Sequence, residues 1–142
     1  MTRRQELVLA ALAPAHGAVH SPVQVQKLLF LIDREIPDQV GGPHFNFRAY
    51  NYGPFDKAVY QDLELLSQTG LVAIIDQTGW HGFQLTTAGQ EQGLRFLNQL
   101  PGPATDYIIR ASEFVRRLSF ANLVSAIYKA YPEMMENSVF EI

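Results

Sequence analysis

The sequence predicts a mainly α-helical domain with a small β-hairpin, which is an α+β arrangement. Apolar residues recur at helical spacing through most of the chain. A β-branched run at residues 71–75 is followed by a turn and a second strand-like segment at residues 82–86. A Leu-Thr-x-x-Gly helix start comes next, at residues 85–89. Helix, hairpin and helix in this order are typical of winged-helix domains, so we expect a winged-helix-type domain with additional C-terminal helices.

Two helices are expected at the beginning of the chain. Leu7, Ala11 and Leu12 fall on one side of a short helix. Segment 21–24 (SPVQ) forms a capping box with proline at the first helical position, so a second helix begins there. Its apolar stripe continues to about Ile36, and Pro37 ends it.

A strand and a third helix are expected in the middle of the chain. Residues 45–50 alternate between apolar and polar, as a half-buried strand does. The Gly53-Pro54 pair is a strong break and predicts a turn at residues 51–54. The third helix follows at once and ends at Gly70, a natural C-cap. Its core face is expected to carry Phe55, Val59, Leu63 and Leu66.

The hairpin is expected to turn at residues 76–79, and three helices are expected after it. The first of these begins at Thr86 or Thr87, either of which can cap it, and it stops at Pro101. The next two are expected at about residues 103–118 and 120–131, the second of them capped by Ser119.

The length of 142 residues fits a single domain. We expect its core at about residues 3–100, a C-terminal helical extension at about residues 103–131 and a tail at residues 132–142. Hydrophobic residues make up 47% and charged residues 18%, which suits a packed core and not a disordered chain. Cysteine is absent, which excludes disulfides, zinc-thiolate sites and cysteine nucleophiles. No run approaches the roughly 18 to 20 apolar residues that span a membrane, so we expect a cytoplasmic protein without membrane contact.

Nothing local in the sequence indicates catalysis. No two histidines stand at a spacing of three or four residues, so metal-ligand spacing is missing. Nucleophile elbows, phosphate-binding loops and dinucleotide fingerprints are missing as well. We therefore expect a protein that is not an enzyme and holds no metal or cofactor, and an enzyme with a site dispersed along the chain is the least favoured alternative.

The third helix offers a candidate partner-binding face. Its outward residues include Asp56, Lys57, Tyr60, Gln61 and Glu64. This face carries a net charge of −1, or −2 when Asp62 is added, and phosphates repel such a face. A protein-docking face and an ordinary solvated face are the two favoured interpretations, and DNA reading ranks below both.

The tip of the hairpin carries Trp80 and His81. Tryptophan is enriched at binding hot spots, so Trp80 is a candidate interface anchor and His81 accompanies it. The alternative is that the indole folds back onto the fourth long helix, because large aromatic side chains are mostly buried.

Basic residues gather outside the third helix. The candidates for nucleic-acid contacts are Arg3 and Arg4 at the start, Arg110, Arg116 and Arg117 on the helix at residues 103–118, and Lys129 on the last helix. Arg110 and Arg117 stand seven residues apart and therefore share a face. Acids outnumber bases by 14 to 11, and a pI near 5.7 is low for a nucleic-acid-binding domain. The alternative is that these bases pair with surface acids.

Two segments resemble the Panacea antitoxin domain, its SocA-like group and related small winged-helix proteins of bacteria and phages. They are residues 25–30 (VQKLLF), similar to the family's early lysine-leucine-rich helix, and residues 47–55 (FRAYNYGPF), similar to its aromatic-x-x-Tyr-Gly-Pro segment, with Val59-Tyr60 after it. The matches cover about residues 23–66. The resemblance implies a non-enzymatic antitoxin that binds and neutralises a partner toxin, or an adaptor that presents it to a protease.

The expected function is therefore that of a non-enzymatic, antitoxin-like winged-helix module that binds a protein partner. The alternative is a DNA-binding transcriptional regulator of the winged-helix type, joined as a homodimer through its C-terminal helices.

Overall fold

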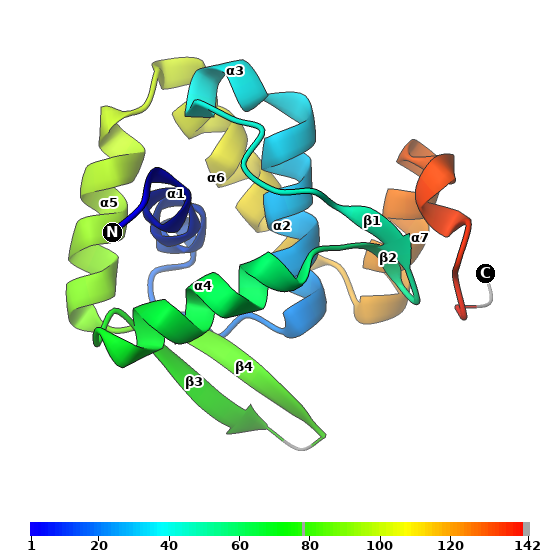
Figure 1. Cartoon of the computed structure of the whole chain (residues 1–142), viewed down its shortest axis with the longest axis horizontal. Coiled ribbons are helices and arrows are strands. Elements are labelled where there is room, and N and C mark those ends of the chain that lie inside the picture. Colours follow the sequence, from blue (N-terminus) through cyan, green and yellow to red (C-terminus); the bar gives the residue numbers. More distant parts are fainter. Residues whose placement is uncertain (78, 141–142) are drawn as a thin grey trace.

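The computed structural model describes residues 1–77 and 79–140 (Figure 1). In chain order the elements are α1 (Arg3–Leu12), the 3-10 turn η1 (Ala13–Ala15), α2 (Pro22–Glu35), α3 (Pro37–Val40), β1 (Arg48–Tyr50), β2 (Gly53–Phe55), α4 (Lys57–Gln68), β3 (Val72–Gln77), β4 (Trp80–Leu85), α5 (Thr87–Gln99), α6 (Gly102–Arg117), α7 (Phe120–Ala130) and the 3-10 turn η2 (Pro132–Met135). Helices dominate and the strands form two antiparallel hairpins, which confirms the prediction of a mainly helical α+β chain.

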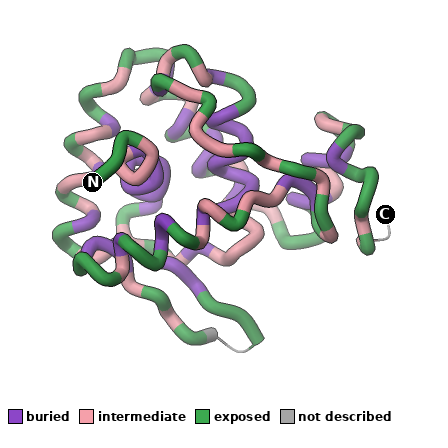
Figure 2. Tube along the Cα trace, viewed as in Figure 1, coloured by how far each residue is buried: buried purple, intermediate pink, exposed green. Residues whose placement is uncertain are grey.

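Helix α1 lies at the centre of the molecule. In Figure 1 it is seen nearly end-on, between α5 on one side and α2 and α6 on the other, with α4 passing below it. Residues 7–12 are all buried (Figure 2), so neighbouring elements cover this segment of the helix on all sides. Small residues permit this packing, because a Cβ on Gly93 of α5 would stand 2.6 Å from the carbonyl oxygen of Leu9.

The predicted helix starts are confirmed at the atoms that cap them. Gln24 N–H donates to Ser21 Oγ at 3.2 Å, and Ser21 N–H donates to Gln24 Oε1 at 2.8 Å. Thr86 caps α5 and Ser119 caps α7. Pro37 ends α2 as predicted, but it also opens α3, a short helix where a loop was expected. Proline has no N–H and suits the first position of a helix, which explains both effects.

The β1–β2 hairpin differs from the predicted strand at residues 45–50 and from the predicted turn at residues 51–54. Strand β1 covers only residues 48–50. The N–H groups of Phe45 and Asn46 donate to the carboxylates of Asp33 and Asp56, so they cannot pair with a neighbouring strand. Gly53-Pro54 is not the turn: it belongs to β2, where Tyr50 pairs with Gly53 and Ala49 with Pro54. Proline fits there because β2 is an edge strand.

The second hairpin, β3–β4, projects from the body of the molecule (Figure 1). Its register runs from Val72 opposite Leu85 to Gln77 opposite Trp80, so β4 begins two residues earlier than predicted. The turn predicted at residues 76–79 includes residue 78, which lies outside the described residues. Two hydrogen bonds between the main chains of His20 and Phe83, of 2.8 and 2.9 Å, tie the hairpin to the segment before α2.

Both helices predicted after residue 102 are present, as α6 and α7. Helix α6 packs along α2, whereas α7 lies beside the β1–β2 hairpin. The main core is a cluster of buried apolar residues that reaches from Leu7 to Met134, so the extension contributes to it. The tail is described as far as Phe140, and residues 141–142 lie outside the described part. Val139 N–H donates to the carbonyl of Asn51 at 2.9 Å, which holds the tail against the β1–β2 turn.

Candidate functional site

A cavity of about 700 Å³ opens where five segments of the described chain meet. These are the start of α2, the β1–β2 hairpin, the first turn of α4, the tip of the β3–β4 hairpin and the start of α7. Its aromatic wall residues are Tyr50, Tyr52, Phe55, Tyr60, Trp80 and Phe120. We call this hollow the aromatic cleft. Its volume lies within the range of about 300 to 1,000 Å³ that is usual for ligand-binding pockets.

Four rings of the aromatic cleft are unusually open to solvent. The exposed fractions are 52% for Tyr50, 41% for Tyr52, 40% for Trp80 and 47% for Phe120. Large aromatic residues are generally buried more deeply in a folded domain. The cleft therefore presents apolar surface that the fold itself leaves uncovered.

One wall of the aromatic cleft is a row of touching rings. Tyr50 stacks on Phe55 with ring centroids 5.0 Å apart, and Phe55 meets Tyr60 at 5.7 Å. Tyr60 in turn stacks on Phe83 of β4 at 5.9 Å. Such contacts hold each ring in place, so this wall is formed before any partner arrives.

A second wall of the aromatic cleft is built from the β1–β2 turn and α7. Tyr52 meets Phe120 edge-on at 5.1 Å, and Phe120 meets Phe140 of the tail at 6.0 Å. The hydrogen bond between Val139 and Asn51 fixes the tail at the same place. The tail thus supports the cleft from behind.

Lys27 is the cationic group of the aromatic cleft. It projects from α2, and only 3% of its surface is exposed. Its Nζ donates to the carbonyl oxygen of Pro54 at 3.2 Å. No acidic side chain of the described residues forms an ion pair with it. Burial without a neighbouring carboxylate lowers the pKa of Lys27 to about 7.

Neighbouring residues fix the position of Lys27 against β2. Gln26, which precedes it, exchanges two hydrogen bonds of 3.0 Å with the main chain of Asp56 and so clamps α2 to the start of α4. Gly53 has a φ of +101°, and a Cβ there would stand 3.2 Å from Tyr128 Cε1 and 3.7 Å from Lys27 Nζ. A glycine is required because a side chain would crowd both neighbours.

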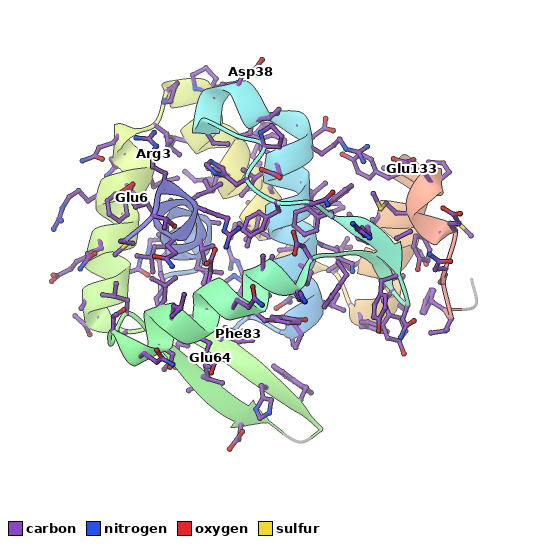
Figure 3. The ribbon with its side chains drawn as sticks, in the orientation of Figure 1. Arg3, Glu6, Asp38, Glu64, Phe83 and Glu133 are labelled. Carbon is purple, nitrogen blue, oxygen red and sulfur yellow. The ribbon has the colours of Figure 1, made fainter. Side chains whose placement is uncertain are left out.

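The predicted outward face of the third helix, now α4, is only partly outward. Lys57, Gln61 and Glu64 are exposed, and Figure 3 shows Glu64 on α4 beside the hairpin. Tyr60 is half-buried between Phe55 and Phe83 and faces the aromatic cleft, which the sequence did not predict. Burial raises the pKa of its hydroxyl.

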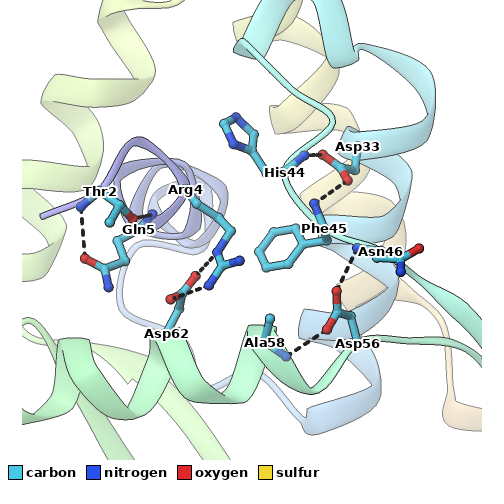
Figure 4. Close-up of polar contacts among 10 residues, drawn as sticks. All are labelled: Thr2, Arg4, Gln5, Asp33, His44, Phe45, Asn46, Asp56, Ala58 and Asp62. Atoms are coloured by element: carbon cyan, nitrogen blue, oxygen red, sulfur yellow. Dashed lines mark hydrogen bonds and ion pairs between the residues drawn. The ribbon is translucent and has the colours of Figure 1, made fainter.

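Two acids counted on that face have structural roles. Asp56 caps α4 by accepting from Ala58 N–H at 2.8 Å, and it also accepts from Asn46 N–H at 2.7 Å (Figure 4). Asp62 is buried and pairs with Arg4 at 2.6 Å. The free surface of α4 is therefore less acidic than the sequence predicts, and its exposed charges are Lys57 and Glu64.

The two residues predicted at the hairpin tip lie there and are both exposed. Trp80 lines the aromatic cleft, and 40% of its surface is exposed. His81 Nδ1 lies 2.8 Å from Asp76 Oδ1 across the hairpin. Of the predicted partner-binding residues, the structure brings Tyr60 and Trp80 together around one hollow.

The six predicted basic contacts do not form one patch. Arg4 is held by Asp62, Arg3 lies at the end of α1 beside α5 (Figure 3), and Lys129 is exposed on α7. Arg116 donates to Ser112 Oγ at 3.1 Å. Arg110 and Arg117 share a groove on α6, which confirms that they lie on one face.

The sequence did not predict the role of Lys27, of the two tyrosines at the β1–β2 turn or of Phe120. One signal was present for Lys27, because it interrupts the apolar stripe of residues 25–32 at a buried position. A lysine is seldom fully buried unless it is paired. The tyrosines and Phe120 gave no such signal, since their meeting depends on the packing of α7 beside the first hairpin.

Within residues 1–77 and 79–140, no group of three or more acidic or histidine side chains could hold a metal ion. None of the helices described has both the length and the hydropathy of a membrane-spanning segment. No family model matches the sequence, and no curated protein is significantly similar to it.

Proposed function

We propose that this chain is a non-enzymatic winged-helix module that acts by binding a protein partner, as an antitoxin binds its toxin. The observation that carries the proposal is the aromatic cleft, with its four half-exposed rings. The order α4, β3–β4 hairpin, α5 supports the winged-helix assignment. The resemblance of residues 25–30 and 47–55 to the Panacea antitoxin domain supports the antitoxin-like role.

The chemistry of the aromatic cleft suits a protein partner. Tryptophan and tyrosine dominate binding hot spots because they bury a large area and lose little conformational entropy. The stacked row from Tyr50 to Phe83 is already ordered, which lowers the cost of binding. We place the docking site in the aromatic cleft, with Trp80 as its central anchor, and not on the outward face of α4.

Capture from the native host with matched variants tests this proposal. We expect the wild-type chain to retain one protein in stoichiometric amount and Trp80→Ala to lose it. Leu65→Ala and Ile109→Ala are controls, because both residues are large and exposed but lie on α4 and α6, away from the cleft. With the purified pair, Trp80→Ala should weaken binding at least tenfold and the controls less than twofold.

If the chain is an antitoxin, the captured protein should also be toxic to the cell. Expressed alone, it should arrest growth, and co-expression of the wild-type chain should restore growth whereas Trp80→Ala should not. A partner that binds all variants equally would remove the aromatic cleft as the docking site. A partner that never inhibits growth would remove the antitoxin role.

A DNA-binding regulator is the second candidate, and one observation favours it. Arg110 and Arg117 share a groove on α6 with the rings of Tyr107 and Phe114. Binding through phosphate contacts weakens steeply as salt rises, because bound counterions are released. A salt titration with duplex DNA tests this candidate. Absence of binding at low salt, or binding that ignores salt, would exclude it.

A further inference from the structure

We infer that Lys27 makes the aromatic cleft selective for a carboxylate: the partner segment that enters it carries an aspartate or glutamate beside a large apolar residue. This inference rests on the proposed protein-binding function and names the chemistry of the segment that is bound. The surroundings of Lys27 and the charge of the cleft support this inference.

The ammonium group of Lys27 has unused donors. A protonated lysine offers three N–H donors and no acceptor. The structure gives Nζ one hydrogen bond, to the carbonyl of Pro54 at 3.2 Å, although the residue is only 3% exposed. A buried charge is costly unless it is paired. An anionic group within the cleft would satisfy the remaining donors and pair the charge.

The carboxylates on the neighbouring elements are already engaged (Figure 4). Asp33 accepts the N–H groups of His44 and Phe45 at 2.6 and 2.9 Å. Asp56 caps α4, and Asp62 is held by Arg4. Among the described residues, none of these acids is available to turn toward Lys27 without breaking its own contacts. We therefore assign the anion that pairs with Lys27 to a bound partner.

The charge of the aromatic cleft favours an anion and limits its size. The described residues that line it include one cation, Lys27, and no acid, although the whole chain carries a net charge of −3. A phosphate group carries up to two charges and is usually held by several donors or by arginine forks. One lysine matches the single charge of a carboxylate. An apolar side chain of the partner that covers the surrounding rings would exclude water and so strengthen this attraction.

The same rings specify the neighbour of the carboxylate. Tyr50, Tyr52, Trp80 and Phe120 surround the cleft that Lys27 lines. A leucine or phenylalanine next to the acid would cover these rings while the acid reaches Nζ. The recognised feature is thus an acid adjoining an apolar side chain, and a run of acids without apolar neighbours would not bind.

The single tryptophan of the chain makes the test direct. Trp80 lines the cleft, so its emission reports on occupancy when the added peptide lacks tryptophan. Two probes differ by one group: acetyl-Leu-Phe-Asp-Gly-amide and the same peptide with asparagine in place of aspartate. At pH 6.5, where Lys27 is largely protonated, we expect the aspartate peptide to bind at least tenfold more tightly.

Two lysine variants complete the design. Lys27→Met keeps the length of the side chain and removes the charge, and it should abolish the preference for aspartate. Lys129→Met removes a charge from the exposed face of α7 and should keep the preference. Equal binding of both peptides to the wild type, a preference that survives in Lys27→Met, or no response to either peptide up to its solubility would overturn the inference.

Failure of the inference differs from failure of the proposed function. If the captured partner is lost by Trp80→Ala but binds Lys27→Met with wild-type affinity, the docking site stands and carboxylate selectivity is wrong. If Trp80→Ala retains the partner while the aspartate peptide still binds through Lys27, the cleft takes carboxylates but is not the docking site of that partner.

Discussion

Burial of Lys27 links the stability of the fold to pH. Its pKa falls from 10.5 to about 7 because the ammonium is removed from water. The unfolded chain therefore holds a proton on this residue between pH 7 and pH 10.5, where the folded chain has largely released it. A group that binds more protons in the unfolded state makes stability increase with pH.

We predict that the free energy of unfolding rises between pH 7 and pH 9.5, measured by urea denaturation. Burial raises the pKa of Tyr107 to about 12 and also raises that of Tyr131, so these groups act above this window. Lys27→Met should flatten the rise and should be more stable than the wild type at pH 7, because it removes a buried charge. A rise of equal size in the variant would contradict the assignment to Lys27.

His20 makes the fold sensitive to acid. It is 1% exposed, and neither ring nitrogen has a hydrogen-bond partner among the described residues. Burial, together with the nearby charge of Arg116, lowers the pKa of His20 to about 4. The unfolded chain binds the proton first as pH falls, so the contribution to stability is complete above pH 6.5 and is lost toward pH 4.

The matching prediction concerns His20→Leu. The wild type should lose about 3 kcal/mol of unfolding free energy between pH 6.5 and pH 4 through this group, whereas the variant should lose distinctly less. Urea denaturation at several pH values measures both. The main-chain pairing of residue 20 with Phe83 remains in the variant, so the hairpin stays attached.

At the scale of the elements, helix packing explains the glycines of α5. A Cβ on Gly93 would stand 2.6 Å from the carbonyl oxygen of Leu9, and a Cβ on Gly89 would stand 1.9 Å from that of Leu71. Carbonyl oxygens of packed elements cannot move aside easily. Close approach, and not helix propensity, therefore determines the residue at both positions.

We predict that Gly93→Ala destabilises the fold by about 1–3 kcal/mol through overpacking, although alanine favours a helix by about 1 kcal/mol over glycine. Gly102→Ala is the control, because nothing lies within 4 Å of a Cβ at that position. Thermal and urea denaturation compare the two. A stabilised Gly93→Ala would show that α1 and α5 can separate without cost.

The elements that could be predicted are those that local physics determines. Capping residues and helical spacing predicted α2, α5 and α7 with their starts, because the capping atoms lie within a few residues of one another. The β1–β2 hairpin and α3 were mispredicted because distant groups decide them. The carboxylates of Asp33 and Asp56 take the N–H groups of residues 44–46, which shortens the strand.

At the scale of the whole molecule, the candidate site is a product of tertiary packing. Trp80 and Tyr60 were predicted as partner-binding residues from residue type and position. Their meeting with Tyr52, Phe120 and Lys27 joins five segments of the described chain, and no local pattern encodes that geometry. The basic residues that were predicted as nucleic-acid contacts do not come together in the same way. The structure spreads them over α1, α6 and α7.

We predict that the C-terminal helices unfold together with the rest of the chain. Ile108, Ile127 and Tyr128 belong to the same buried cluster as Leu9 and Leu28. Hydrogen exchange should therefore give the amides in the middle of α7 the same opening free energy as those of α1, as expected for one cooperative unit. Earlier exchange throughout α7 would show that the extension is a separate unit.

The central position of α1 also bears on how the chain is made. Helix α1 is synthesised before α5, against which it packs, and more than seventy residues separate the two helices. While those residues are being added, the six apolar residues 7–12 lack the cover that α5 provides. The nascent chain therefore exposes an apolar helix during this interval, and we expect chaperones to bind at this segment.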